Sequence, residues 1–88
     1  MEVLYAPTFL RMLKALPAEL QEEATKKIEL FRRRETHKAL KVHKLKGRLV
    51  GRYSFSINYH IRVVFLFSNI RGKRSAYLLA IGDHAIYR

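Results

Sequence analysis

The pattern of apolar positions changes once along the chain, from a helical period to strict alternation. In the first third, apolar residues recur three or four positions apart, which is the spacing of one helix face. These residues are Phe9, Leu13 and Leu16, followed after Pro17 by Leu20, Ala24, Ile28 and Phe31. Proline ends one helix and suits the first turn of the next. The pattern therefore predicts a short strand at 1–5 and a helical hairpin, with Thr8 as the first N-cap.

From Leu49 onward apolar and polar residues alternate, as in strands. We expect a strand at about 52–57, a tight connection at 58–60, a strand at 61–67, a polar loop at 68–75 and a last strand at 76–82. The last two strands are apolar on both faces, so helices should cover one side of the sheet. The predicted fold is α+β, in the order β-α-α-β-β-β, with the strand and hairpin packed on a small antiparallel sheet in one domain over 1–88.

Composition excludes several classes of protein. The chain has 88 residues, 49% of them apolar and 11% aromatic, which suits one globular domain and argues against disorder. It has no cysteine, which excludes disulfides, a thiolate nucleophile and thiolate metal sites. No apolar run approaches the roughly 20 residues of a membrane span, and no signal-peptide pattern is present. We expect a cytoplasmic protein that does not enter a membrane.

The net charge of +11 is unevenly placed. Residues 1–31 hold four basic and five acidic residues, whereas residues 32–88 hold fourteen basic residues and only two acidic ones, Glu35 and Asp83. A field of one sign concentrated on part of a small domain attracts polyanions. Nucleic acid and an acidic protein both fit as partners, and a generally soluble basic surface is the alternative.

Two stretches could bind phosphate. The first is the connection 43–48, which gathers His43, Lys44, Lys46 and Arg48 around a glycine; the alternative is a solvated basic loop. The second is Arg62, which falls inside an apolar strand and so must reach solvent or a partner. A guanidinium on a rigid strand suits a phosphate that gains charge in a transition state. The alternative is an arginine at a strand end that contacts only water.

The last seven residues, 82–88, form a third candidate stretch. They combine Asp83, His84, Tyr87 and Arg88 directly after a strand. Histidine can pass protons near neutral pH, and a phenol can stack on a base. The alternative is a frayed polar tail. A metal site is not expected, because His37 and His43 have no nearby carboxylate except Glu35.

Together these stretches resemble the RelE/ParE superfamily of toxins from bacterial toxin–antitoxin modules, and within it the YafQ-like and RelE-type mRNA interferases. The resemblance rests on segments 43–57, 61–65 and 81–87, with the helical hairpin ahead of them, and so covers nearly the whole chain. It implies a RelE-like fold and an endoribonuclease that cleaves messenger RNA, often on the ribosome, without a metal or other cofactor.

The resemblance also implies roles for individual residues. His84 would be the principal general acid or base with His43 as its counterpart, Arg62 would stabilise the phosphorane, and Tyr87 would orient a base or the phosphate. The RNA backbone would be held by Lys44, Lys46, Arg48 and Arg52. Two further RNA-binding positions, Ser54 and Ser56, carry serine at about the places where RelE-type members have lysines. Ser56 also lies near the position of an additional histidine in YafQ-like members.

Two alternatives have the same fold: a ParE-like inhibitor of DNA gyrase, which would not depend on the terminal histidine, and a basic domain that binds RNA or an antitoxin without chemistry. If the protein is a toxin, we expect an acidic antitoxin encoded by a neighbouring gene. This antitoxin would compete with RNA for the basic face. Its apolar anchors would be whichever of Phe9, Leu10, Met12 and Leu13 the core leaves free. If the core needs all four, the partner would rest on charge alone.

Overall fold

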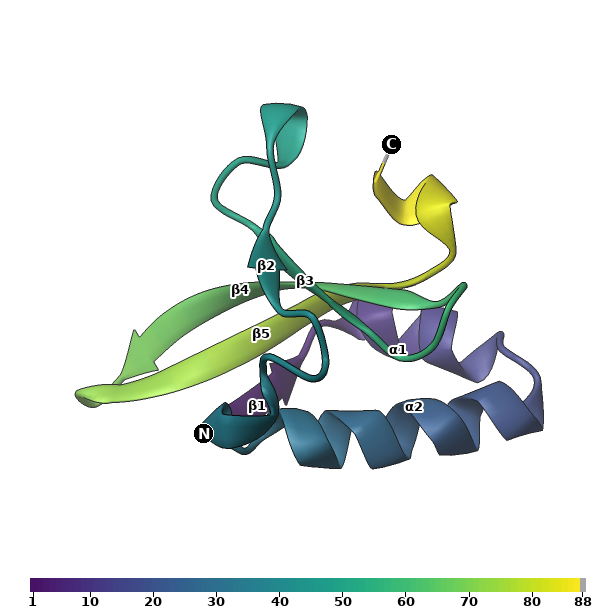
Figure 1. Cartoon of the computed structure of the whole chain (residues 1–88), viewed down its shortest axis with the longest axis horizontal. Helices are drawn as coiled ribbons and strands as arrows, with labels where there is room; N and C mark the ends of the chain where they lie inside the picture. Colours follow the sequence, from purple (N-terminus) through teal and green to yellow (C-terminus); the bar gives the residue numbers. More distant parts are fainter. Residues whose placement is uncertain (88) are drawn as a thin grey trace.

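The computed structural model describes residues 1–87, in which a helical hairpin covers one face of a five-stranded sheet (Figure 1). The helices are α1 (Pro7–Lys14) and α2 (Ala18–Phe31). The strands are β1 (Glu2–Tyr5), β2 (His43–Lys44), β3 (Tyr53–Ser56), β4 (Arg62–Ile70) and β5 (Lys73–Gly82). Short 3₁₀ helices are η1 (Arg34–Thr36), η2 (Gly47–Leu49) and η3 (His84–Tyr87). The predicted α+β class is confirmed.

The sheet is mixed, which corrects the expectation of a purely antiparallel one. Its strand order is β1-β5-β4-β3-β2, and β1 pairs in parallel with β5, with Val3 opposite Ala76. Parallel neighbours need a long crossover connection, which the helices and the rest of the sheet supply. The added strand β2 is two exposed residues long. Alternation along one strand reveals neither the direction of its neighbour nor so short an edge strand.

The polar loop expected at 68–75 is instead a two-residue turn. The β4–β5 ladder continues to its end, with Ser68 opposite Ser75 and Ile70 opposite Lys73. Arg71 and Gly72 have φ values of 53° and 78°. Positive φ at both central residues defines a turn whose twist matches that of the strands it joins. Polar residues at this end of the hairpin therefore remain in strands because their backbone groups are paired.

The two predicted helices are confirmed, although the first begins earlier than expected. Its N-cap is Ala6, Pro7 is the first helical residue, and Thr8 lies inside the helix, so Thr8 is not the cap. Proline fits here because the first helical N–H has no partner within the helix in any case. Pro17 precedes α2, as its position predicted. Within residues 1–87, no helix is long and apolar enough to cross a bilayer.

The core lies between the helices and the sheet and is built from aromatic rings. Phe31, at the end of α2, is fully buried and stacks on Phe55 of β3 with ring centroids 4.2 Å apart. It also meets the edge of Phe65 at 4.8 Å and the ring of His37 at 4.8 Å. The apolar side chains on one face of the helices thus pack against the apolar side chains on one face of the strands, in a single core layer. The opposite face of the sheet, which the helices do not cover, carries the remaining strand side chains.

Candidate functional site

The sheet face turned away from the helices carries the residues singled out from the sequence. Side chains alternate between the two faces of a strand. Phe55 and Val63 belong to the core with the helices, so Ser54 and Arg62 lie on the other face. Strand pairing sets two rows across that face, one through His43, Ser54, Val64 and Ala80, the other through Ser56, Arg62 and Gly82. Three of the five strands, β2, β3 and β4, thus bring a candidate residue to this face.

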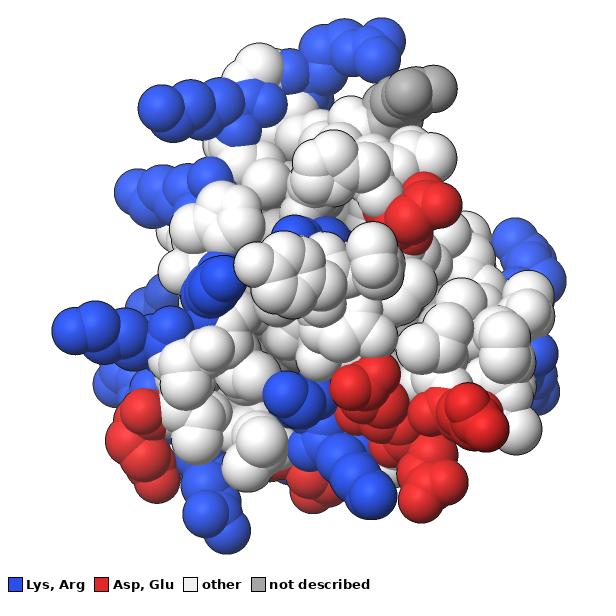
Figure 2. All heavy atoms as spheres, turned by 45° about the vertical axis from the view of Figure 1, so that its right-hand side comes forward, with Lys and Arg blue, Asp and Glu red and all other residues white. Residues whose placement is uncertain are grey.

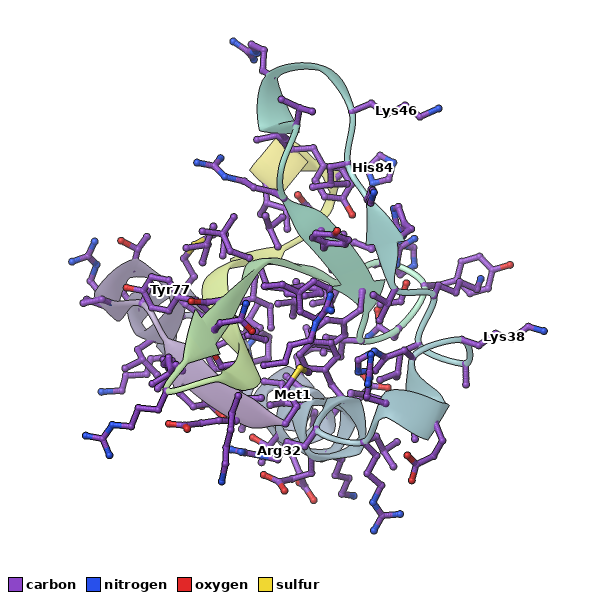
Figure 3. All side chains as sticks on the ribbon, turned by 90° about the vertical axis from the view of Figure 1, so that its left-hand side faces the viewer. Met1, Arg32, Lys38, Lys46, Tyr77 and His84 are labelled. Carbon is purple, nitrogen blue, oxygen red and sulfur yellow. The ribbon has the colours of Figure 1, made fainter. Side chains whose placement is uncertain are left out.

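The basic connection forms a protruding hairpin between β2 and β3, which rises above the sheet on the side away from α2 (Figure 1). The amide of Leu45 donates to the carbonyl of Arg52 at 2.9 Å, which closes the hairpin. Gly47 and Gly51 have φ values of 69° and 89°, which glycine adopts without strain. The four cations that it carries are all exposed: Lys44, Lys46, Arg48 and Arg52. Lys46 extends into solvent at the top of Figure 3.

His43 lies at the base of this hairpin, where a hydrogen bond sets its tautomer. Its Nδ1 is 2.7 Å from the carbonyl oxygen of Lys41. A carbonyl can only accept, so Nδ1 carries the proton and Nε2 of the neutral ring keeps a free lone pair. The side chain is exposed. In this form His43 can accept a proton from a bound group.

Arg62 is the first residue of β4 and is half-buried. Its Nη1 donates to the carbonyl oxygen of Asn58 at 2.6 Å, which holds the guanidinium against the β3–β4 turn. The ion pairs within residues 1–87 are Lys26 with Glu22 and Arg32 with Glu29, so no carboxylate neutralises Arg62 in the described chain. Its charge therefore remains available to an anion.

The C-terminal residues dock on the sheet, so the alternative of a frayed polar tail does not apply to residues 83–87. The carboxylate of Asp83 accepts from the amide of Ala85 at 2.9 Å and so caps η3. A Cβ on Gly82 would lie 2.7 Å from Cγ2 of Ile86, which shows how closely η3 approaches β5. His84 is exposed, with its ring centroid 5.5 Å from that of Tyr87. Figure 3 shows His84 in the upper part of the molecule, below Lys46. Arg88 lies outside the described residues.

Ser54 and Ser56 differ in what they offer to RNA. Ser54 is fully buried, and its hydroxyl is 2.6 Å from that of Tyr87. In this arrangement Ser54 holds the C-terminal turn, which corrects the expectation that it contacts RNA directly. Ser56 is half-buried and lines a pocket beside Arg62.

That pocket was not anticipated from the sequence. It has a volume of about 260 Å³ and lies between α2, the segment 39–41 and the β3–β4 turn. Lys27, Lys41 and Tyr59 line it together with Arg62. Tyr59 was the available signal, because an aromatic residue in a tight turn between two strands cannot join the core and stands exposed.

Charge is separated over the surface. Figure 2 shows lysine and arginine side chains over the top and the left side, with others at the right and lower edges, while most of the visible acidic side chains gather at the lower right. Four of the acidic residues lie on α2: Glu19, Glu22, Glu23 and Glu29. The basic hairpin therefore faces solvent at a distance from the acidic patch. Within residues 1–87, no three histidine, aspartate or glutamate side chains come close enough to hold a metal ion.

Comparison with known proteins finds matches among solved structures alone. No protein-family model and no curated protein matches the sequence. The YoeB/ParE toxin from Agrobacterium tumefaciens superposes with a TM-score of 0.73 at 18% identity, covering 96% of this chain and 99% of that one. YafQ from Escherichia coli gives 0.70 at 10% identity, covering 98% and 96%. A YoeB–YefM toxin–antitoxin complex from Staphylococcus aureus gives 0.69 at 18%, covering 96% and 97%.

These structures span almost the full length of both chains, so the likeness concerns the whole domain and not one motif. It includes the helical hairpin and the mixed sheet described above. The chain therefore has the fold of the RelE/ParE-type toxins, as the resemblance in its sequence implied.

Proposed function

We propose that this protein is the toxin of a toxin–antitoxin system and an endoribonuclease that cleaves messenger RNA, on the ribosome, by acid/base catalysis without a metal. The observation that carries the proposal is that His43, Arg62 and the turn bearing His84 share the sheet face turned away from the helices. The toxin fold supports it independently. Residues far apart in the sequence thus supply a base, an acid and an anion-binding cation.

The reaction needs a proton to leave the ribose 2′-hydroxyl and another to reach the 5′-oxygen. Nε2 of His43 accepts the proton of the 2′-hydroxyl, because its Nδ1–H is committed to the carbonyl of Lys41. The 2′-oxygen bonds to phosphorus, and the bond from phosphorus to the 5′-oxygen breaks. His84, in its imidazolium form, protonates that oxygen. The products are a 2′,3′-cyclic phosphate and a free 5′-hydroxyl.

Cations around the phosphate lower the barrier to this reaction. The pentacoordinate phosphorane carries more negative charge than the substrate, so a fixed guanidinium stabilises it preferentially. Arg62 serves this role, since the carbonyl of Asn58 fixes its guanidinium. Lys44, Lys46, Arg48 and Arg52 hold the backbone on the hairpin, and Tyr87, tied to Ser54, orients the nucleotide.

An acidic antitoxin is the second proposed partner. It would cover the basic face and compete with RNA for the same cations. Of the four apolar residues considered on α1, Phe9 is fully buried, Met12 and Leu13 pack against the core, and Leu10 remains 40% exposed. Leu30 on α2 is also 40% exposed. These two leucines are the apolar anchors that the helical side offers. Simultaneous binding of RNA and antitoxin without loss of RNA affinity would contradict occlusion.

The test is His84→Ala, compared with the wild type and with His60→Ala, which removes another exposed histidine. Loss of a general acid or base costs about 10²- to 10⁴-fold in rate. We expect His84→Ala to lose RNA cleavage and growth arrest by such a factor while unfolding at the same temperature as the wild type. His60→Ala should retain both activities. Cleavage by His84→Ala at the wild-type rate would overturn the catalytic proposal.

A second candidate function is a domain of the same fold that acts by binding alone, on DNA gyrase or on RNA. The observation in its favour is the pair of serines on β3, because a site with lysines there would hold the phosphate more strongly. Growth arrest that persists in His84→Ala without RNA cleavage would support this candidate.

A further inference from the structure

The pocket beside Arg62 has the charge of an anion site. It is lined by three cations, Lys27 of α2, Lys41 and Arg62 of β4, and no acidic side chain lines it in the described chain. Three cations around a hollow of about 260 Å³ repel one another, and a bound polyanion would relieve that repulsion.

Hydrogen bonds hold the walls of the pocket in place before any ligand arrives. The amide of Ser56 donates to the carbonyl of Leu40 at 2.9 Å, which joins the segment 39–41 to β3. Asn58 donates from Nδ2 to the carboxylate of Glu23 at 2.7 Å, and its Oδ1 accepts from the amide of Ile61 at 2.8 Å. The β3–β4 turn is thereby tied to α2. A preformed site costs less ordering entropy on binding.

Tyr59 gives the pocket an aromatic rim. Tyr59 is 89% exposed, more than any other large apolar residue within residues 1–87. An exposed ring beside cations is the combination on which single-stranded nucleic acids stack their bases. An acidic peptide would use the cations but has no need of a free aromatic face, so the ring favours RNA.

The pocket adjoins the proposed cleavage site through two residues. Arg62 lines the pocket and also lies in the row that crosses the open sheet face. Lys41 lines the pocket, and its carbonyl accepts from Nδ1 of His43. A strand of RNA bound at His43 and Arg62 can therefore continue into the pocket without leaving the protein surface.

We propose that this pocket is a nucleotide subsite next to the cleavage position, and this rests on the proposed function. Lys27 and Lys41 hold the phosphate that adjoins the scissile one, Arg62 lies between the two phosphates, and the base of that nucleotide stacks on Tyr59. The ligand class is a nucleotide within single-stranded RNA. The subsite extends the binding track from the basic hairpin across the sheet face to α2.

The first experiment locates the base. A short single-stranded RNA with 5-iodouridine bases and 2′-fluoro sugars cannot be cleaved through a 2′-hydroxyl, so binding is measured apart from catalysis. Irradiation should crosslink the RNA to Tyr59, identified by mass spectrometry of the digested protein. Tyr59→Leu should lose the crosslink and weaken binding about tenfold, the order expected for loss of one stacked base, whereas Tyr59→Phe should bind as the wild type. Crosslinks confined to other residues, or unchanged binding by Tyr59→Leu, would overturn the subsite.

The second experiment tests the phosphate contacts. Replacing Lys27 and Lys41 together by glutamine removes two charges and keeps the length of both stems. The slope of log affinity against log salt should flatten by about 0.7, the contribution of one phosphate of a single strand, because the two lysines hold the same phosphate. The matched control is Lys14→Gln with Lys73→Gln, two exposed lysines outside the pocket, which should leave the slope unchanged. If the pair at 27 and 41 weakens binding of polyglutamate but not of RNA, the pocket is a protein site and the proposal is wrong.

The two proposals fail separately. An RNA that crosslinks to Tyr59 but is not cleaved in its 2′-hydroxyl form would overturn the ribonuclease and leave the pocket as a binding site for single-stranded RNA with no cleavage position beside it. Cleavage without the crosslink, and without an effect of the lysine pair, would leave the ribonuclease standing and overturn the subsite.

Discussion

The hydroxyl oxygens of Ser54 and Tyr87 lie 2.6 Å apart, although 33 positions separate the two residues in the chain. This hydrogen bond joins the C-terminal turn to the third strand of the sheet. Ser54 is fully buried beneath it. The bond therefore fixes the turn that carries His84 over the face that carries Arg62.

The two sides of this bond should contribute unequally to stability. Tyr87→Phe leaves the buried Ser54 hydroxyl without its partner and should lower the free energy of unfolding by about 1–3 kcal/mol. Ser54→Ala leaves only the half-buried phenol to find water, and should cost about 1 kcal/mol. Denaturant unfolding of both variants and of the double variant measures the coupling. Ser56→Ala, on the same face two residues further along β3, is the control. If the losses of unfolding free energy in the two single variants were equal and added up to that of the double variant, a direct bond between Ser54 and Tyr87 would be contradicted.

Gly82 should tolerate no side chain while Ile86 is present. A Cβ at this position would lie 2.7 Å from Cγ2 of Ile86, so Gly82→Ala should displace η3 and cost about 1–3 kcal/mol of unfolding free energy. It should also reduce RNA cleavage, because His84 moves with the turn. Gly82→Ala combined with Ile86→Ala removes the clash, so the double variant should be less destabilised than the two single effects predict. Strict additivity would show that η3 does not pack on Gly82.

Phe31 should be the most costly single truncation in the core. Its ring is fully buried between His37, Phe55 and Phe65. Phe31→Ala should lower the free energy of unfolding by about 3–5 kcal/mol, which is most of the stability of a marginal domain. Leu30→Ala, one residue earlier and 40% exposed, should cost less than about 1 kcal/mol. Thermal unfolding followed by circular dichroism compares the two, and similar losses would be inconsistent with this core.

The basic hairpin should bind RNA through phosphates and without regard to sequence. Replacing Lys44 and Lys46 by alanine should weaken binding of all single-stranded RNAs about equally and flatten the salt slope by about 1.4. Fluorescence anisotropy at several salt concentrations measures both. The control pair is again Lys14 with Lys73. A loss confined to one RNA sequence would show base contacts in place of backbone contacts.

The elements of the fold could be predicted because their signals are local. Phe9 and Phe31 belong to segments in which apolar residues recur every three or four positions, and Phe55 and Phe65 belong to segments in which they alternate. Each pattern can be recognised within about ten residues of sequence. The candidate site could be predicted only as separate stretches. Neither the alternation around Arg62 nor the composition of 82–88 shows that the two meet.

Sequence by itself determined the helical hairpin, four of the five strands, the concentration of positive charge after residue 31 and the residue types available for chemistry. Tertiary structure decided the parallel pairing of β1 with β5, the burial of Ser54 beneath Tyr87, the docking of η3 on Gly82 and the pocket rimmed by Tyr59. The physical reason is that amphipathic periodicity reports which face of each element is buried, whereas contacts between distant residues depend on how all the elements pack together. Ser54 and Ser56 have the same local pattern, and only the packed chain distinguishes the one that holds the C-terminal turn from the one that lines the pocket.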